Sequence, residues 1–281
     1  MASPFKKLAA RRWAGIRDHW LGHLPQIDFD VAYPHPTLWE LPDFAKTLGA
    51  TGKEEIIEYI PGVREAIFRE AVILARKLAY CWSIAQISAG SGRQTWTAVA
   101  AYEASFYGAK AFCYMLGFAS LGRDSKFYLD AFHETAIKLK RPRIIQLDLQ
   151  SHNLQSRLEH STLWAITERL LNTATFGPNI SPTHDALRAI DWSSFSAFRN
   201  RVMYVGSFWP FADAQGSCDL AREFCHPEIF AALDPLQDVA APFAAHYFIV
   251  GKLFRTILHL MFADIATLAP AVSSEAMALQ V

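Results

Sequence analysis

Apolar residues recur at steps of three and four along two long, adjacent stretches of the chain, as they do on one face of an amphipathic helix. In the first stretch the recurring residues are Val63, Ile67, Ala71, Leu74, Leu78, Cys81 and Ile84. Two serines and two glycines follow within residues 88–92, where they can end one helix and begin the next. The pattern therefore predicts a helix over residues 63–87 and a short connection after it.

The second stretch predicts a longer helix, from about Gln94 to Phe118, with two different apolar faces. One face carries mostly large residues, namely Val99, Tyr102, Phe106, Ala109, Cys113 and Leu116. The face beside it carries small residues, namely Ala101, Ala104, Ser105, Gly108 and Ala111. Small side chains let a neighbouring backbone approach closely. We therefore expect the helix over residues 63–87 to pack there as an antiparallel partner.

Weaker patterns predict further helices along the rest of the chain, over residues 125–139, 154–175, 183–190 and 239–266. Residues 144–149 alternate between polar and apolar too briefly to predict a strand. Prolines at positions 25, 34, 36 and 42 lack an amide proton and have a fixed φ, which disfavours regular structure. Residues 25–62 are therefore expected to form a wrapping segment with one short helix.

The N-terminal residues show a basic amphipathic pattern. The basic side of a possible helix carries Lys6, Lys7, Arg11, Arg12 and Arg17, and the other side carries Phe5, Leu8, Trp13, Ile16 and Trp20. Such a helix can bind a membrane or RNA, act as a targeting element, or dock on the protein with a solvated basic face. The whole pattern predicts an all-α protein: an antiparallel helical bundle over residues 63–270, an N-terminal extension over residues 1–62 and a flexible tail over residues 271–281.

Composition indicates a folded protein without a global charge. Of the 281 residues, 52% are hydrophobic and only 19% are charged, so the chain has enough apolar surface for a continuous core. Lys and Arg total 27, as do Asp and Glu, so no overall field attracts the protein to nucleic acid or to an anionic membrane. Any anion-binding site must therefore be local.

The sequence shows no secretory signal pattern and no uninterrupted run of about 20 apolar residues, which a membrane-spanning helix needs. The few cysteines are typical of reduced thiols in a cytoplasmic protein. Cys218, Cys225 and His226 lack the paired close spacings of a structural zinc site. We therefore expect a soluble, cytoplasmic protein without a bound metal or cofactor.

Two segments resemble parts of a known family. Residues 101–112 read AYEASFYGAKAF, and residues 198–208 read FRNRVMYVGSF. Together they resemble HEPN-domain proteins (higher eukaryotes and prokaryotes nucleotide-binding), over roughly residues 63–265. In that family an early helix carries a run like the first segment, and a later helix begins with Arg, a polar residue, a few more residues and His. Arg199 and Asn200 match this start, whereas Tyr204 stands where the family has His.

The resemblance implies a helical bundle that commonly forms a homodimer and acts on RNA or a nucleotide without a metal, in a defence or toxin–antitoxin-type system with a cognate protein partner. Arg199, Asn200 and Tyr204 would be the catalytic positions. Arg199 suits this role because its guanidinium can bind a phosphate through two hydrogen bonds. A tyrosine with a pKa of about 10 is ionised in only about one molecule per thousand at pH 7, so Tyr204 is a poor substitute for His. Arg201 lies beside the motif, and Glu103 and Lys110 can add polar groups to the same cleft; these three are the expected substrate-binding residues.

Three alternatives remain open. A catalytically inactive interaction protein would keep the bundle for dimerisation or partner binding. An unrelated helical enzyme would have its pocket among Trp82, Trp96, Tyr107 and His133. In a purely structural interpretation, the arginines near position 200 are solvated or paired with acids, and Tyr204 packs through its ring.

Overall fold

Most of the regular structure is helical. The computed structural model describes residues 10–24, 54–56, 63–91, 93–120, 127–132, 134–135, 138–139, 143–146, 160–192, 195 and 241–267. Within these ranges the chain forms six helices and several short strands. The prediction of a mainly helical protein is therefore confirmed. In the part of the chain that the structure describes, no helix is both long enough and apolar enough to cross a membrane.

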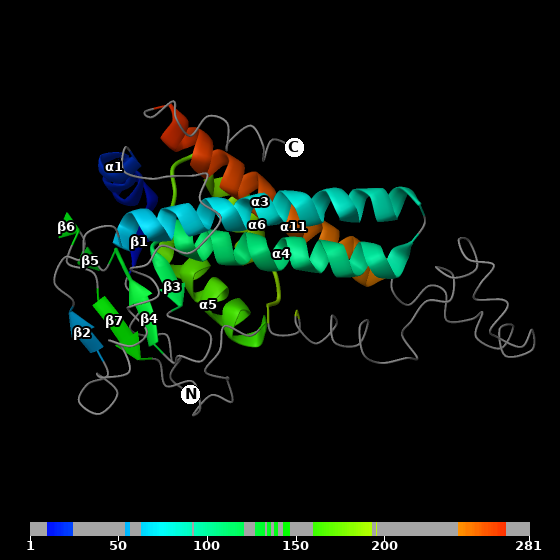
Figure 1. The fold of residues 1–281 in the computed structure, drawn as a ribbon, viewed down its shortest axis with the longest axis horizontal. Coiled ribbons are helices and arrows are strands. Elements are labelled where there is room, and N and C mark those ends of the chain that lie inside the picture. Colours follow the sequence, from blue (N-terminus) through cyan, green and yellow to red (C-terminus); the bar gives the residue numbers. More distant parts are fainter. Residues whose placement is uncertain are drawn as a thin grey trace, which may run out of the picture.

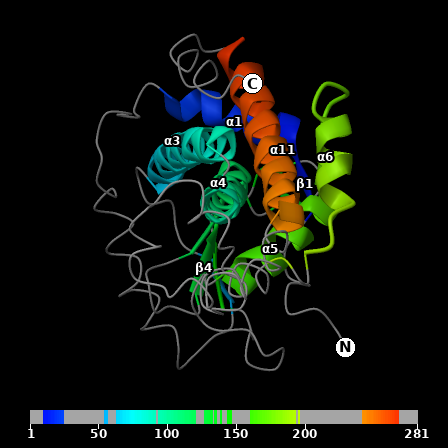
Figure 2. The same cartoon turned by 90° about the vertical axis from the view of Figure 1, so that its right-hand side faces the viewer.

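The two long helices predicted from the sequence form an antiparallel hairpin (Figure 1). They are α3 (Val63–Gly90) and α4 (Gln94–Met115), and they share the most extensive contact between elements. A third long helix, α11 (Ala241–Ala266), makes the next most extensive contact, again with α4. Figure 2 shows α4 flanked by α3 on one side and α11 on the other, with α5 below it. The hairpin and the C-terminal helix therefore agree with the predicted pattern.

The small-residue face of α4 lets two helices approach at once. A Cβ atom added to Gly108 would lie 2.5 Å from Leu78 Cδ1 of α3 and 2.6 Å from Phe254 Cβ of α11. Both distances are well below a van der Waals contact, so both neighbours need the space that the missing side chain leaves. The predicted antiparallel packing of α3 on this face is confirmed, and α11 shares the same face.

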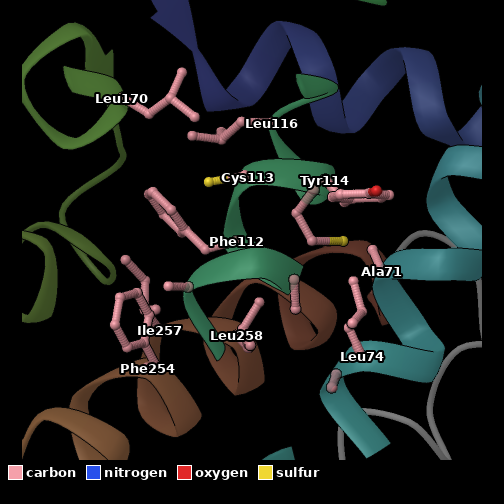
Figure 3. Close-up of a cluster of buried hydrophobic side chains, with 14 of the residues drawn as sticks. Ala71, Leu74, Phe112, Cys113, Tyr114, Leu116, Leu170, Phe254, Ile257 and Leu258 are labelled. Atoms are coloured by element: carbon pink, nitrogen blue, oxygen red, sulfur yellow. The ribbon is translucent and has the colours of Figure 1, made fainter. Parts of the chain in front are cut away.

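The core gathers around the C-terminal half of α4 (Figure 3). The Phe112 ring of α4 and the Phe254 ring of α11 have centroids 6.3 Å apart, and Ile257 lies beside Phe254. Cys113 lies near Leu170 of α5, and all five side chains are buried. Helix α4 is therefore the central helix of the fold.

Helix α4 ends earlier than predicted. Its last residue is Met115, and Gly117 has a φ of +73°, which glycine adopts without the steric cost that a Cβ would bring. The amide of Gly117 donates to the Tyr114 carbonyl at 2.8 Å. Phe118, the predicted end of the helix, instead begins strand β3 (Phe118–Ser120).

A small antiparallel sheet replaces the helix predicted over residues 125–139. Its strand order is β2 (Glu54–Ile56), β7 (Arg143–Gln146), β4 (Phe127–Asp130) and β3. Strands β5 (Glu134–Thr135) and β6 (Lys138–Leu139) form a separate pair. The prediction was wrong because a short run of aromatic and aliphatic residues, such as Phe127 to Leu129, also suits a strand whose pairing supplies the hydrogen bonds. Residues 144–149, left unassigned above, contain most of β7.

The N-terminal residues dock on the bundle. Strand β1 (Arg11–Arg12) precedes α1 (Trp13–His23), in which Trp13, Ile16 and Trp20 are buried as the apolar side of the pattern predicts. Arg11 does not lie on a solvated basic face, because its side chain is fully buried and its Nη2 is 2.8 Å from Asp130 Oδ1. That part of the prediction was wrong, since the partner lies 119 residues away in the sequence.

Two further helices complete the described fold. Helix α5 (His160–Thr173) falls inside the predicted 154–175 helix and continues into β8 (Ala174–Thr175), which pairs in parallel with β1. Helix α6 (Ser181–Arg188) begins two residues before the expected start, with a proline in its first turn. Of the predicted wrapping segment, residues 25–62, only β2 is described, and the predicted tail lies outside the described residues.

Candidate functional site

The residues of the family-like motif lie outside the described part of the chain. These are Arg199, Asn200, Arg201 and Tyr204. Their roles stay predictions. Phe195, four positions before Arg199, is described and fully buried. The expected substrate-binding residues Glu103 and Lys110 are also described, and both belong to α4.

One face of α4 is accessible, and it carries both of these residues. Between Ala98 and Met115 the helix is buried except for five half-buried residues, which are Val99, Glu103, Phe106, Tyr107 and Lys110. Steps of three, four, seven and eight residues place side chains on one face of a helix. We call these five residues the open face of α4. The structure thus brings Glu103 and Lys110 to a common surface, with two aromatic rings between them.

Helix α3 borders the open face on one side. The ammonium group of Lys77 lies 5.5 Å from the centroid of the Tyr107 ring, within the range of a cation–π contact. Burial raises the pKa of the Cys81 thiol and the nearby Glu103 carboxylate raises it further, whereas Lys77 acts in the opposite direction. Glu103 and Lys77 therefore both lie close to Cys81.

Burial shifts the pKa of both Tyr107 and Lys110, but different neighbouring charges act on the two groups. Burial and then the Glu103 carboxylate raise the pKa of Tyr107. Burial lowers the pKa of Lys110, while Glu70 of α3 favours its charged form. At neutral pH the thiol and the phenol are thus held in their neutral forms.

Helix α5 borders the open face on the other side with His160, its first residue. Tyr102 Oη lies 2.7 Å from His160 Nδ1, and the indole of Trp164 donates to the same hydroxyl oxygen at 3.1 Å. The centroid of the Phe106 ring is 4.5 Å from that of His160. Because an indole N–H can only donate, Tyr102 can in turn donate to His160 Nδ1, and the neutral imidazole then carries its proton on Nε2.

His160 was missed in the sequence because nothing local marks it. It stands at the start of an apolar helix, and its hydroxyl partner lies 58 residues earlier in what reads as a packing face. The histidine at this border could be recognised only once α4 and α5 were known to be neighbours.

An aromatic cluster connects this border to Phe195. The Phe195 ring stacks on Tyr102 at 5.7 Å and meets Trp164 edge-on at 4.5 Å, measured between ring centroids. The Tyr247 hydroxyl of α11 donates to the Phe195 carbonyl at 3.0 Å. Phe195 is therefore anchored at the same cluster that holds His160 in place.

A cavity elsewhere in the described structure lies where several elements meet. Its volume is about 350 Å³, and it lies between α1, the turn before α6 and the end of α11. Its polar groups interact with each other, because Asp264 accepts hydrogen bonds from Trp13 at 2.8 Å and from Arg17 at 3.3 Å. We therefore regard the open face of α4 as the better candidate site.

The alternative pocket among Trp82, Trp96, Tyr107 and His133 has little support. Trp82 is buried, with its ring centroid 4.1 Å from that of Phe248 in α11, whereas Trp96 is 51% exposed. His133 lies outside the described residues. Trp82 therefore belongs to the core.

The described residues contain no cluster of three or more His, Cys, Asp or Glu side chains that could hold a metal ion. Of the cysteines, Cys81 and Cys113 are described, and both are free thiols. Comparisons of the chain with models of protein families, with curated protein sequences and with solved structures found no match.

Proposed function

We propose that this protein is a HEPN-like module that acts on RNA or a nucleotide, in a defence or toxin–antitoxin-type system. Arg199 binds a phosphate, Asn200 orients it, and Tyr204 occupies an altered catalytic position. The observation that carries the proposal is the composition of the open face of α4, where aromatic rings lie between ionisable side chains. Arg201, Glu103 and Lys110 contact the substrate.

The chemical groups of the open face match those of a single-stranded nucleic acid. Each base offers a flat face that stacks on an aromatic ring, and each phosphate attracts a cation. Phe106 and Tyr107 supply rings with centroids 5.7 Å apart, the Lys77 ammonium group lies over the Tyr107 ring, and Lys110 belongs to the same face of α4. Such a local surface can bind RNA although the chain as a whole has no net charge.

In this proposal the protein mainly binds RNA or a nucleotide, because Tyr204 stands where the family has a catalytic His. A phenol of ordinary pKa is a weak base at neutral pH, so cleavage at this position would be slow. Any cleavage would be independent of metal ions. The module is thus expected to hold RNA or a nucleotide more effectively than it cuts it.

Replacing Arg199 by alanine tests the proposal. Loss of a charge-assisted contact to phosphate is expected to weaken binding of a fluorescent single-stranded RNA about tenfold to hundredfold, as measured by anisotropy. The variant should unfold at the same temperature as the wild type. Arg188→Ala is the matched control, because this arginine is exposed and belongs to α6, which contributes no residue to the open face. Equal RNA affinity in wild type and Arg199→Ala would refute the proposed role.

A second candidate function, that of a non-catalytic dimerisation or partner-binding protein, is favoured by exposed apolar residues near the far end of the hairpin. Tyr80 and Ile87 of α3 are each 69% exposed, and Ile84 lies between them in sequence. Trp96 of α4 and Ile249 of α11 are 51% and 59% exposed. Exposed large apolar side chains are typical of interaction surfaces where they form a continuous patch.

This surface leads to a prediction about oligomeric state. The wild type is expected to be a homodimer in light scattering coupled to size exclusion, and Ile87→Glu is expected to shift it toward the monomer, because the interface would bury an unpaired charge. Gln86→Glu adds the same charge at an exposed neighbouring position of α3 and should leave the dimer intact. A monomeric wild type would exclude dimerisation through this surface.

A further inference from the structure

We propose that the far end of the α3–α4 hairpin binds the surface of an anionic membrane, with apolar side chains among the acyl chains and cations at the lipid phosphates. We call this end the hairpin tip; it consists of Tyr80, Ile84 and Ile87 of α3, Arg93 in the connection and Trp96 of α4. None of these residues belongs to the open face of α4. The proposal therefore goes beyond RNA or nucleotide binding and does not depend on it.

The side chains that α3 contributes form one exposed stripe. Lys77, Tyr80, Ile84 and Ile87 follow one another at steps of three, four and three residues, which place side chains on one face of a helix. Tyr80 and Ile87 are each 69% exposed, and Ile84 is 36% exposed. The stripe extends over about 15 Å, since each helical residue adds about 1.5 Å. Large apolar side chains exposed next to one another in this way indicate a surface that meets something other than water.

The connection between the two helices brings Trp96 to the same end of the fold. The amide of Arg93 donates to the Ser88 carbonyl at 2.9 Å, and the amide of Ser91 donates to the Ile87 carbonyl at 3.1 Å. Trp96 follows Arg93 by about one helical turn and is 51% exposed. Figure 1 shows the connected ends of α3 and α4 at the opposite end of the hairpin from the sheet. Among the described elements, the tip is therefore well placed to meet a flat surface.

The part of the sequence that forms the tip carries only positive charge. Residues 71–102 contain Arg76, Lys77 and Arg93 and no Asp or Glu, although the whole chain has as many acidic as basic residues. Lys77 and Arg93 are exposed, one at each end of the stripe. Anionic headgroups attract lysine and arginine, while tryptophan and tyrosine favour the boundary between headgroups and acyl chains. The charges and the aromatic residues of the tip thus both match an anionic lipid surface.

This combination favours lipid over a second copy of the chain and over a nucleic acid. Two copies that met through this face on a two-fold axis would present the same cations to each other, with no carboxylate from residues 71–102 between them. Isoleucine side chains cannot stack on bases as aromatic rings do. Lipid acyl chains accept both aliphatic and aromatic side chains, and headgroup phosphates accept hydrogen bonds from a guanidinium. The second copy considered above is therefore the alternative occupant that the experiment has to exclude.

Binding to vesicles tests the proposal. The full-length protein is mixed with vesicles of phosphatidylcholine and phosphatidylserine, or of phosphatidylcholine alone, and the bound protein is measured by flotation. The wild type is expected to bind the anionic vesicles more tightly, and added salt should weaken this binding. Ile87→Ser should weaken it by at least about tenfold, because the isoleucine side chain no longer enters the lipid. Arg93→Gln should weaken binding to the anionic vesicles about fivefold and leave binding to phosphatidylcholine alone unchanged.

Each variant has a matched control. Gln86→Ser introduces the same residue as Ile87→Ser at an exposed neighbouring position of α3, and Arg188→Gln removes an exposed arginine from α6. Both controls should bind vesicles as the wild type does, and thermal unfolding establishes that every variant is folded.

Three results would overturn the proposal. The wild type would bind no vesicles, it would bind both kinds equally, or Ile87→Ser would bind as tightly as the wild type. A wild-type homodimer that binds no vesicles would assign the tip to a second copy. The affinity for single-stranded RNA should be the same in the wild type and Ile87→Ser, so the function proposed above succeeds or fails separately.

Discussion

Asp130→Ala is expected to lower the free energy of unfolding by about 3–5 kcal/mol, the usual cost of leaving a buried charge without its partner. The Arg11 and Asp130 side chains are both fully buried, and Asp130 Oδ1 accepts from Arg11 Nη1 at 3.1 Å and from Nη2 at 2.8 Å. After the substitution the guanidinium has to stay unpaired in the interior or pull out of it. Urea unfolding with linear extrapolation measures the difference.

Asp18→Ala is the matched control for this experiment. Its carboxylate lies 2.7 Å from Arg17 Nη2, but the Asp18 side chain is 60% exposed, so solvent screens the pair. Exposed pairs of this kind contribute about 0–1 kcal/mol. A loss in Asp130→Ala no larger than that in Asp18→Ala would show that the Arg11 ion pair does not hold the N-terminal residues in place.

Gly108→Ala is expected to destabilise the protein by about 1–3 kcal/mol, as overpacking of a core does. The new methyl group would collide with Leu78 of α3 and Phe254 of α11, both within 2.6 Å of its position. Alanine is favoured over glycine inside a helix by about 1 kcal/mol, so a net loss means that the collision outweighs this gain. Thermal or urea unfolding provides the measurement.

Other glycines provide a graded series for the same measurement. A Cβ atom on Gly90, at the end of α3, meets nothing within 4 Å, so Gly90→Ala should be neutral or slightly stabilising. A Cβ atom on Gly251 of α11 would lie 3.1 Å from the Trp82 ring, and its effect should fall between the other two. If Gly108→Ala were as stable as Gly90→Ala, the result would contradict the close packing of α3, α4 and α11 at Gly108.

The long helices could be predicted because the apolar pattern that indicates each of them lies within its own segment of the sequence. Each of α3, α4 and α11 repeats apolar residues over several turns, which no strand pattern imitates. The small-residue face of α4 likewise predicted a close antiparallel partner. Its second partner, α11, begins more than 120 positions after α4 ends, and a single sequence cannot show which helices meet at such separation.

The sheet could not be predicted for a related reason. Its described strands have three or four residues each, too few for alternation to be distinguished from a helical pattern. What stabilises them is pairing, such as Tyr128 with Ile145 and Glu54 with Ile145, between segments far apart in sequence. The burial of Arg11 could not be predicted either, because its charge is compensated in the interior by Asp130, which is distant in sequence.

The candidate site was predictable in part. Helical spacing alone places Glu103 and Lys110 on one face, and the structure agrees. The sequence gives no reason to choose His160, because its position depends on the packing of α5 against Tyr102 and Phe106. The motif beginning at Arg199 rests on the family resemblance, and the experiments above are its test.

The docking of α1 also determines when the fold can be completed during synthesis. Trp20 of α1 donates to the Met115 carbonyl at 3.0 Å, and Trp13 donates to Asp264, 251 residues later. A chain emerging from the ribosome therefore exposes these indoles until α4 and then α11 have been made. Ribosomes that stall before residue 264 should carry chains whose first helix is accessible to chaperones and proteases, and that access should end only when the last long helix has emerged.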